Sequence, residues 1–388
     1  MAILLWGVPE GDDFTWDLTY KFKSDECVNE TTGSITAFQK YFSPTRELKF
    51  QLGATGDDAL ERMAAFLFAG ATIVTSPLWF FRTSLLTEVT SGSTELLVSD
   101  ASEFYAGEQA LIMNASIPSV CELITIDSVA GSTIYFSTPV VYDYSPMTMP
   151  TSVAPYDYTS AFMMPVISGI LEYEGLDYIS GLPGLGMKAK IDGGVWSSFV
   201  DPVAPDGYTF LGLAMDAKYN SPKILRDLCG SENGIISMYA HGSTSKLTFE
   251  CNWQFKDSSW KTLRDAFFVA KGKSVPFYIS TNMYELVTTR GSDAGSSTIF
   301  LNPGYQYLWE RYPYILIQSS RTGVQSVVYI TDHVYRDEFA CEPLPNELYD
   351  GDRGCFFVLG RFDSDELTFS FKGLNMCYAK AIFIEEYS

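Results

Sequence analysis

The chain has 388 residues, of which 46% are hydrophobic, 15% aromatic and only 19% charged. A chain of this length usually forms two or three domains, and this composition excludes a disordered protein. The formal net charge is −21, and no Lys or Arg lies between Arg82 and Lys188. Because nucleic acids and anionic lipids attract clustered cations, the charge excludes non-specific binding to either.

The N-terminus predicts no export signal, because MAILLWGVPEGDD has no basic start and only a short apolar run. We therefore expect a protein that is made and used without secretion. Its seven cysteines are odd in number, dispersed and without a C-x-x-C pair. This pattern favours buried free thiols over a disulfide framework or a zinc site.

The first strong structural signal is a strand followed by a helix, beginning at Leu48. Apolar residues recur at three- and four-residue steps and predict a helix over 58–69 that ends at Gly70. Residues 63–81 carry no charge and are long enough to span a membrane. Gly70 and Pro77 interrupt this stretch, so we expect a short helix and a buried strand, and no membrane insertion.

Short strands separated by turn residues follow, and they predict a small β-barrel-like insert at about 83–145. A connector rich in glycine and proline then occupies residues 156–245, and strand pieces within it, such as Phe162–Ile170, are expected to join the sheets.

The same order of signals returns from Leu247. A strand is followed by a helix predicted over 258–271, which ends at Gly272, and then by Pro276, an aromatic strand, a second set of short strands and closing strands. The repeated order predicts two similar modules, 1–155 and 246–388, and chance similarity of two β-rich halves is the alternative. The helices are expected to place Phe66 or Leu67, and Phe267 or Phe268, in the cores.

The predicted fold class is therefore mainly β with α+β modules. Each of two tandem similar halves is expected to be a sheet with one short helix and an inserted small β-barrel-like domain.

The sequence indicates no catalytic residue, cofactor or metal site. His241 and His333 stand alone, without partners spaced for a nucleophile or for zinc. Gly272-Lys-Ser resembles the end of a phosphate loop but lacks its first glycine and follows a helix. Asp350 and Asp352 lack the longer ligand ladder of a calcium loop.

Six residues are candidates for structural or interface roles. Arg46 and Arg361 lie beside strand signals in an acid-rich chain, where a guanidinium can form carboxylate pairs. The others are Trp79, Trp260, Pro276 and Asp365.

Several short motifs, in their order, resemble those of a structural tail protein family of tailed bacteriophages. The motifs are Ser43-Pro-Thr-Arg46, Pro77-Leu-Trp79, Gly107-Glu-x-Ala-Leu-Ile112, Trp260-x-x-Leu263, Phe267-Phe268, Gly272-Lys-x-x-Pro276-Phe277 and Arg361-Phe-Asp-Ser-Asp-Glu-Leu367. The resemblance covers about three quarters of the chain. The connector carries none of these motifs, and the stretch before Ser43 lacks the Glu-x-Arg run of the family.

This resemblance implies a tail-tip or distal-tail protein, part of the virion and assembled in the host cytoplasm, that joins the tail tube to the adhesion apparatus. Its expected partners are the tube, other tail-tip proteins and its own copies in a cyclic ring, a trimer first and a hexamer second. The alternative is a carbohydrate-binding receptor module at the tail tip, and a hydrolase of cell wall or capsule comes third.

Overall fold

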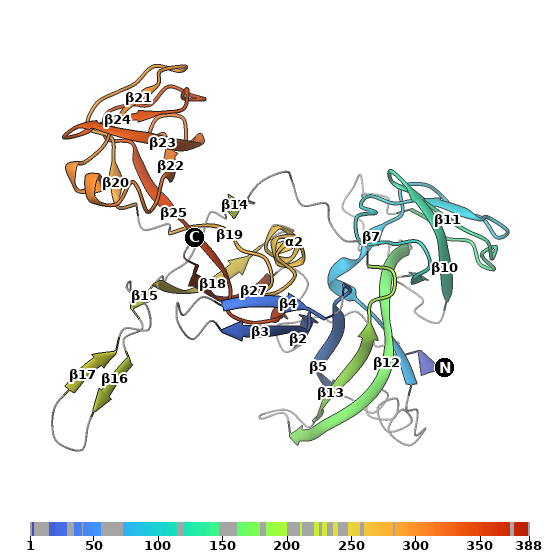
Figure 1. Ribbon diagram of the computed structural model, residues 1–388. Coiled ribbons are helices and arrows are strands. Elements are labelled where there is room, and N and C mark those ends of the chain that lie inside the picture. Colours follow the sequence, from blue (N-terminus) through green and yellow to red (C-terminus); the bar gives the residue numbers. More distant parts are fainter. Residues whose placement is uncertain are drawn as a thin grey trace. The chain divides into compact units, whose positions relative to one another are not determined.

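The computed structural model describes the chain in segments, which are residues 2–3, 15–28, 35–40, 42–55, 73–114, 120–146, 161–178, 184–199, 210–211, 221–224, 227–230, 236–239, 247–256, 260–281, 284–372 and 376–386. These segments are mainly strands, with one described α-helix, which confirms a mainly β fold (Figure 1).

The chain divides into two compact units that do not follow the order of the sequence. Unit 1 contains residues 1–21, 43–200 and 368–378, and unit 2 contains residues 22–42, 201–367 and 379–388. Each unit therefore includes one segment from the opposite end of the chain.

The sheet of unit 1 has the strand order β2–β5–β13–β12–β6–β1. All neighbours are antiparallel except β1, which runs parallel to β6. The end of β26 (Glu366–Lys372) pairs with β2. The bounds are β1 (Ala2–Ile3), β2 (Thr15–Lys21), β5 (Thr45–Thr55), β6 (Ile73–Pro77), β12 (Ala161–Tyr178) and β13 (Gly184–Val195).

The sheet of unit 1 separates an apolar face from a charged face because its side chains alternate. On β5, Leu48 and Phe50 are buried, while Glu47 and Lys49 lie on the other face. The core extends across β2, where Trp16 packs 5.4 Å from Phe50 between ring centroids.

A small β-domain is inserted into unit 1 between β6 and β12. It begins after the short 3₁₀ helix η1 (Trp79–Phe81) and has its own hydrophobic cluster, which includes Leu96, Ile112, Ile134 and Tyr144. Its strands are β7 (Thr83–Ser84), β8 (Glu95–Leu97), β9 (Gln109–Asn114), β10 (Cys121–Ala130) and β11 (Thr133–Phe136).

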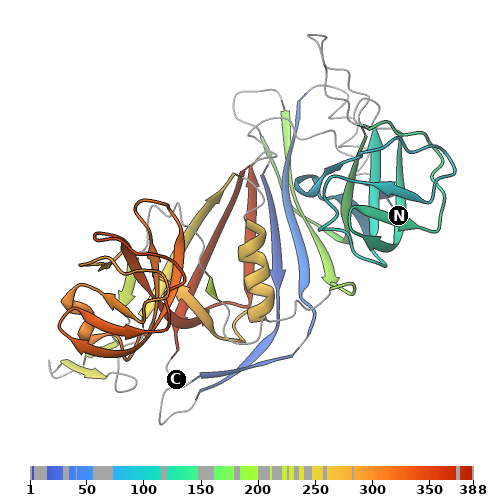
Figure 2. The same ribbon diagram turned by 90° about the horizontal axis from the view of Figure 1, so that it is seen from above.

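The sheet of unit 2 has the order β15–β18–β27–β25–β19–β14, and here β14 runs parallel to β19. The bounds are β14 (Phe210–Leu211), β15 (Ser221–Ile224), β18 (Leu247–Phe255), β19 (Phe277–Ser280), β25 (Arg353–Phe362) and β27 (Met376–Glu385). Helix α2 (Trp260–Ala270) lies along this sheet (Figure 2). Phe267 of the helix packs 5.1 Å from Phe362 of β25 between ring centroids.

A second small β-domain is inserted into unit 2 between β19 and β25. Its hydrophobic cluster includes Ile299, Ile317, Phe339 and Leu348. It contains β20 (Leu286–Val287), β21 (Thr298–Phe300), the 3₁₀ helix η2 (Pro303–Tyr307), β22 (Tyr314–Gln318), β23 (Gln325–Tyr335) and β24 (Glu338–Cys341).

The two units share one order of strand pairings. In unit 1, β12 pairs with β13, β6, β7 and β9. In unit 2, β25 pairs with the counterparts β27, β19, β20 and β22. Within the inserts, β11 pairs with β8 and β10, as β24 pairs with β21 and β23. Such a one-to-one match is expected of a duplicated chain.

Each half also carries a two-stranded arm between the first two long strands of its sheet. The first arm is β3 (Ser24–Val28) paired with β4 (Ile35–Gln39). The second arm is β16 (Asp227–Gly230) paired with β17 (Ile236–Tyr239). The first arm belongs to unit 2, although β2 and β5 on either side of it belong to unit 1.

The predicted second helix is confirmed, because α2 lies inside residues 258–271 and buries both Phe267 and Phe268. The predicted first helix, over 58–69, lies outside the described residues. In the segments that the structure describes, no helix is long and apolar enough to cross a membrane.

Candidate functional site

Helix α2 and the turn that follows it involve four of the six predicted structural residues, namely Trp260, Pro276, Arg361 and Asp365. Trp260 is buried at the start of α2. After the helix, Lys271 and Gly272 adopt positive φ angles of 52° and 67°. Pro276 is half-buried and lies directly before β19. The left-handed backbone at Gly272 ends the helix in the way that glycine favours.

Two further predicted residues bind this turn. Asp365 Oδ1 accepts the backbone N–H of Lys273 at 3.1 Å. Arg361 donates from Nη1 to the Lys273 carbonyl at 3.3 Å, and its Nε lies 2.8 Å from Glu386 Oε1. A Cβ at Gly272 would lie 2.6 Å from Asp365 Oδ1, so the close approach of this carboxylate requires glycine.

The same carboxylate binds the start of the first arm. Asp365 Oδ2 accepts the N–H and the hydroxyl of Ser24 at 2.9 and 2.6 Å, and the Phe22 N–H donates to the Asp365 carbonyl at 2.8 Å. The Phe22 ring packs against Phe267 and Phe268 at centroid distances of 5.5 and 6.3 Å. We call Phe22, Ser24, Asp365 and these two helix residues the arm junction. It joins the base of the first arm to the second half of the sequence.

In unit 1, Arg46 joins strand β5 to the inserted domain. Its Nη2 lies 3.0 Å from Glu108 Oε1, and its guanidinium carbon lies 4.4 Å from the centroid of the Trp196 ring. Trp196 also donates a hydrogen bond to Glu108. Trp79 lies elsewhere in unit 1, buried in η1. The two predicted arginines therefore each pair with a glutamate, in different units.

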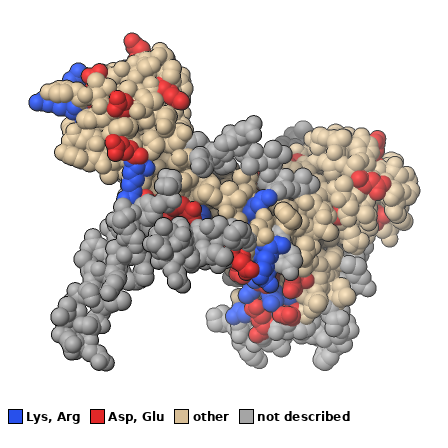
Figure 3. All heavy atoms as spheres, viewed as in Figure 1, with Lys and Arg blue, Asp and Glu red and all other residues tan. Residues whose placement is uncertain are grey.

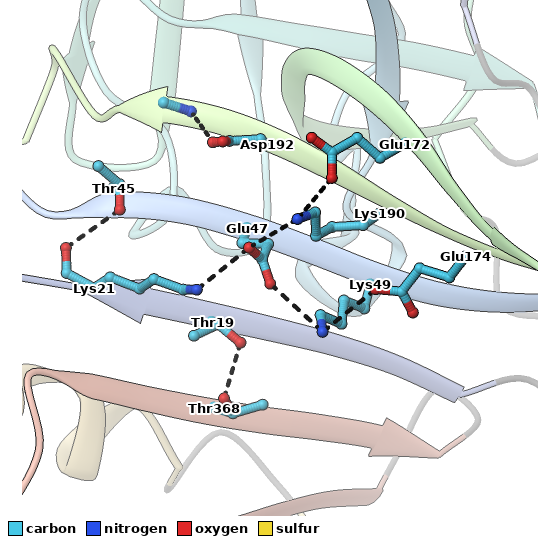
Figure 4. Close-up of polar contacts among 11 residues, drawn as sticks. Thr19, Lys21, Thr45, Glu47, Lys49, Glu172, Glu174, Lys190, Asp192 and Thr368 are labelled. Carbon is cyan, nitrogen blue, oxygen red and sulfur yellow. Dashed lines mark hydrogen bonds and ion pairs between the residues drawn. The ribbon is translucent and has the colours of Figure 1, made fainter.

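Ion pairs cross the face of the unit 1 sheet that lies opposite its core (Figure 4). Glu47 on β5 lies 3.3 Å from the Lys21 amine, 3.8 Å from that of Lys190 and 3.9 Å from that of Lys49. The hydrogen bond from Lys190 to Glu172 raises the pKa of Lys190. This face is therefore polar and holds both charge signs close together.

The inserted domain of unit 1 carries acidic but no basic residues, because the cation-free stretch 83–187 includes all of it. In the face drawn in Figure 3, acidic but no basic spheres appear over β10 and β11. A copy of this domain would repel another copy placed against it.

No group of three or more metal-binding side chains occurs among the residues that the structure describes. His333 Nε2 lies 3.1 Å from the Arg336 carbonyl, and its ring packs 4.9 Å from that of Phe339. His241 lies outside the described residues. The described side chains therefore hold segments of the chain together through ion pairs and through hydrogen bonds to the backbone.

Sequence reasoning missed the partners of the predicted residues, namely Phe22, Ser24, Glu108, Trp196 and Glu386. One usable signal was present, because apolar residues alternate from Trp16 to Phe22 and predict a strand face that continues to Phe22. The glutamate partners have no such signal, since their contacts lie far along the chain.

Asp352, which lacks the ligand ladder of a calcium loop, binds backbone groups of the fold. Its carboxylate accepts the Ser320 N–H and hydroxyl, each at 2.7 Å, and the Tyr349 N–H at 2.8 Å. Burial alone would raise the pKa of Asp352, but these hydrogen bonds stabilise the charged form, and the pKa lies below its usual value.

We expect Asp352→Asn to lower the free energy of unfolding by about 1.5–3 kcal/mol at pH 7, because hydrogen bonds to a charged group are lost. A depressed pKa contributes stability above the unfolded value of about 3.9, and this is lost as the pH falls through the folded value. Urea unfolding at pH 7 and pH 3 should therefore show a difference between the two proteins that shrinks at pH 3. An equal difference at both pH values would contradict this role.

Cys251, Cys341 and Cys377 are free thiols with raised pKa values. Burial, aided by Glu250, raises the pKa of Cys251 to about 12, and burial, aided by Glu342, raises that of Cys341 to about 11. Burial also raises the pKa of Cys377. Since the thiolate is the reactive form, these thiols should react slowly.

We expect Cys251, Cys341 and Cys377 to resist alkylation by iodoacetamide at pH 8 in the folded protein and to react fully in guanidinium chloride. Mass spectrometry of peptides resolves each site. Modification of Cys377 at the same rate in both states would show that its strand is not packed as described.

The chain matches no protein-family model and no curated protein.

Proposed function

We propose that this protein is a structural component of a bacteriophage tail, at the tail tip or baseplate, where copies of the chain form a ring between the tail tube and the adhesion apparatus. The observation that carries the proposal is the matched order of strand pairings in units 1 and 2. A ring of such chains presents twice as many similar modules as it has subunits. A threefold ring can then match a sixfold tube.

The positions of the motif residues support a structural role. Arg361 and Asp365 bind Lys273 in the turn after helix α2, and Trp260 packs against Arg264 within the helix. Residues of a motif that hold a module together are expected in a protein whose task is to be a rigid part. The motifs that resemble the phage family thus coincide with contacts inside the fold.

The charge of the first inserted domain supports its position in such a ring. A domain with acidic residues and no basic ones avoids its own copies, so we expect it to face water or a basic neighbour. Heterologous contacts between unlike faces then close the ring.

The test is a cryo-EM map of purified particles of the phage that encodes this chain. We expect a closed ring of this protein at the tip of the tail, threefold first and sixfold second. Absence of the chain from purified particles, or its presence there as an isolated monomer, would overturn the proposal.

A carbohydrate-binding module is the second candidate, and one feature of unit 2 favours it. Tyr278, Tyr314 and Tyr329 lie in a row across β19, β22 and β23, with neighbouring ring centroids 4.7 Å apart. Val327 on the same face of β23 is exposed. A row of aromatic rings with hydroxyl groups offers both stacking and hydrogen bonds to a ligand.

A glycan array with the whole chain tests this alternative, with Tyr329→Ala as the variant and Tyr307→Ala, an exposed tyrosine of η2, as the control. Binding that only Tyr329→Ala removes would favour the receptor module. Degradation of peptidoglycan or capsule by the protein would instead favour the hydrolase.

A further inference from the structure

Residues near the start of the chain are bound by residues of the second half of the sequence. The arm junction holds the base of the first arm through Asp365 and helix α2, both from the second half. Just before the arm, β2 pairs with the end of β26, and the hydroxyl groups of Thr19 and Thr368 lie 2.8 Å apart (Figure 4). Thr19, Phe22 and Ser24 are thus each bound by residues that follow position 260.

The second half contains the same segment, in the same order. Strand β15 pairs with β18 as β2 pairs with β5, and the arm β16–β17 follows β15 as β3–β4 follows β2. Within the described residues, no strand is registered against the other edge of β15. A two-stranded arm is marginally stable by itself, and an open strand edge readily pairs with another chain.

The first half contains the matching acceptor. β12 continues past its pairing with β6, which ends at Ile170, and residues 172–178 pair along one edge with β13. Among the described residues, no strand pairs with the opposite edge of residues 172–178. In the second half, the corresponding continuation of β25 is β26, the strand that pairs with β2. Residues 172–178 are therefore the counterpart of β26.

A specific acceptor residue follows from the register. Val166 of β12 pairs with the last residue of β6, and Phe357 of β25 pairs with the last residue of β19. Glu174 lies as far beyond Val166 as Asp365 lies beyond Phe357. A carboxylate thus occurs in both halves at the position of Asp365, and Glu174 is 42% exposed, with its Oε1 3.4 Å from the Lys49 amine.

We propose that β15 and the second arm of one copy dock beside residues 172–178 of β12 in a second copy, repeating between chains the contact that segment 15–39 makes within one chain. The inference rests on the proposed ring, since it names the surface through which the copies meet. Among the described residues, neither β15 nor the second arm pairs with residues 172–178 of its own chain, and we therefore place the acceptor in a second copy. The contact joins unlike faces, and such contacts close into rings.

One residue limits how much the strand pairing contributes. Pro222 in β15 has no N–H to donate, which is tolerated on an edge strand. The arm is therefore expected to carry more of the contact than β15 does.

Cysteine pairs test the contact in purified phage particles. Because Thr19 lies opposite Thr368, Leu18 lies beside Phe369. The counterpart of Leu18 is Ile224, since Leu18 pairs with Leu48 as Ile224 pairs with Leu247, and the counterpart of Phe369 is Tyr178. We expect a chain with both Ile224→Cys and Tyr178→Cys to form covalent multimers on oxidation, and each single variant to stay monomeric. As a control, Thr19→Cys with Thr368→Cys should form a bond within one chain.

The outcomes separate this inference from the proposed function. Rings that contain the double variant but yield only monomers would overturn the docking and leave the tail function in place. Absence of the chain from particles would overturn both.

A carboxylate exchange gives a second, independent test. We expect Glu174→Gln to weaken ring assembly while Glu172→Gln, two residues away on the same strand, assembles normally. The unfolding midpoint of both variants should match that of the parent. Equal assembly of both variants would show that Glu174 is not the acceptor.

Discussion

Replacing Arg361 by alanine is expected to lower the free energy of unfolding of unit 2 by about 3–5 kcal/mol, since removing one partner of a buried ion pair leaves the other without its counter-charge. The Arg361 side chain is only 4% exposed and holds both Glu386 and the carbonyl of Lys273. Its loss therefore removes a donor from the Lys273 carbonyl in the turn after α2 and from the Glu386 carboxylate, which directly follows β27. Chemical denaturation followed by tryptophan fluorescence measures the change.

The matched control is Lys380→Met in the same unit. Lys380 Nζ lies 2.9 Å from Glu250, but the lysine side chain is 57% exposed. An exposed pair contributes about 0–1 kcal/mol. If Arg361→Ala were as stable as this control, the guanidinium would not be part of what holds the turn.

Truncating Phe267 to alanine is expected to cost about 3–5 kcal/mol, the range for removing a buried aromatic ring from a core. The Phe267 side chain is fully buried and contacts Phe22 of the first half as well as Phe362 of β25. The cavity would open between the arm base, the helix and the sheet. Hydrogen exchange should therefore show faster exchange in the first arm as well as in α2.

Tyr307→Ala serves as the control for this truncation, because Tyr307 is 82% exposed and its removal opens no cavity. We expect a change within about 0.5 kcal/mol, as for most surface substitutions. Loss of protection in α2 with an unaffected first arm would mean that Phe22 does not depend on the helix for its position.

Both predictions bear on assembly as well as on stability. The arm junction is a contact made inside one chain, and the proposed contact between copies repeats its plan with Glu174 in place of Asp365. A weakened arm junction should disorder the first arm without touching the second. Ring formation by a destabilised Phe267→Ala protein would therefore show that the two contacts act independently.

The sequence by itself determined the features that depend on neighbours along the chain. Alternation of apolar and polar residues is a local pattern, so strands such as β5 and β18 could be predicted from it. Helix α2 and its end at Gly272 follow equally from local spacing and from the left-handed backbone that glycine accepts. The structural candidates Arg361 and Asp365 were found because they stand in a motif beside these elements.

The structural roles of the glycines could not be predicted from the local sequence. The glycine- and proline-rich stretch from 156 to 245 was interpreted as a connector with a strand piece at 162–170, and the glycine-rich β13 that pairs with β12 was not predicted. A Cβ at Gly169 would collide with the carbonyl oxygen of Asp192, so this glycine lies in a strand where another backbone approaches closely. Composition alone does not distinguish such a glycine from one in a loop.

Only the tertiary structure decided which segments belong together. Nothing in residues 22–42 indicates that they pack with unit 2, or in residues 368–378 that they pack with unit 1. Strand pairing and ion pairs join residues hundreds of positions apart, and the alternating pattern of a strand names its buried face but not its partner. Ser24 binds Asp365 within unit 2 and Thr19 meets Thr368 within unit 1, because each unit combines segments that are far apart in the sequence.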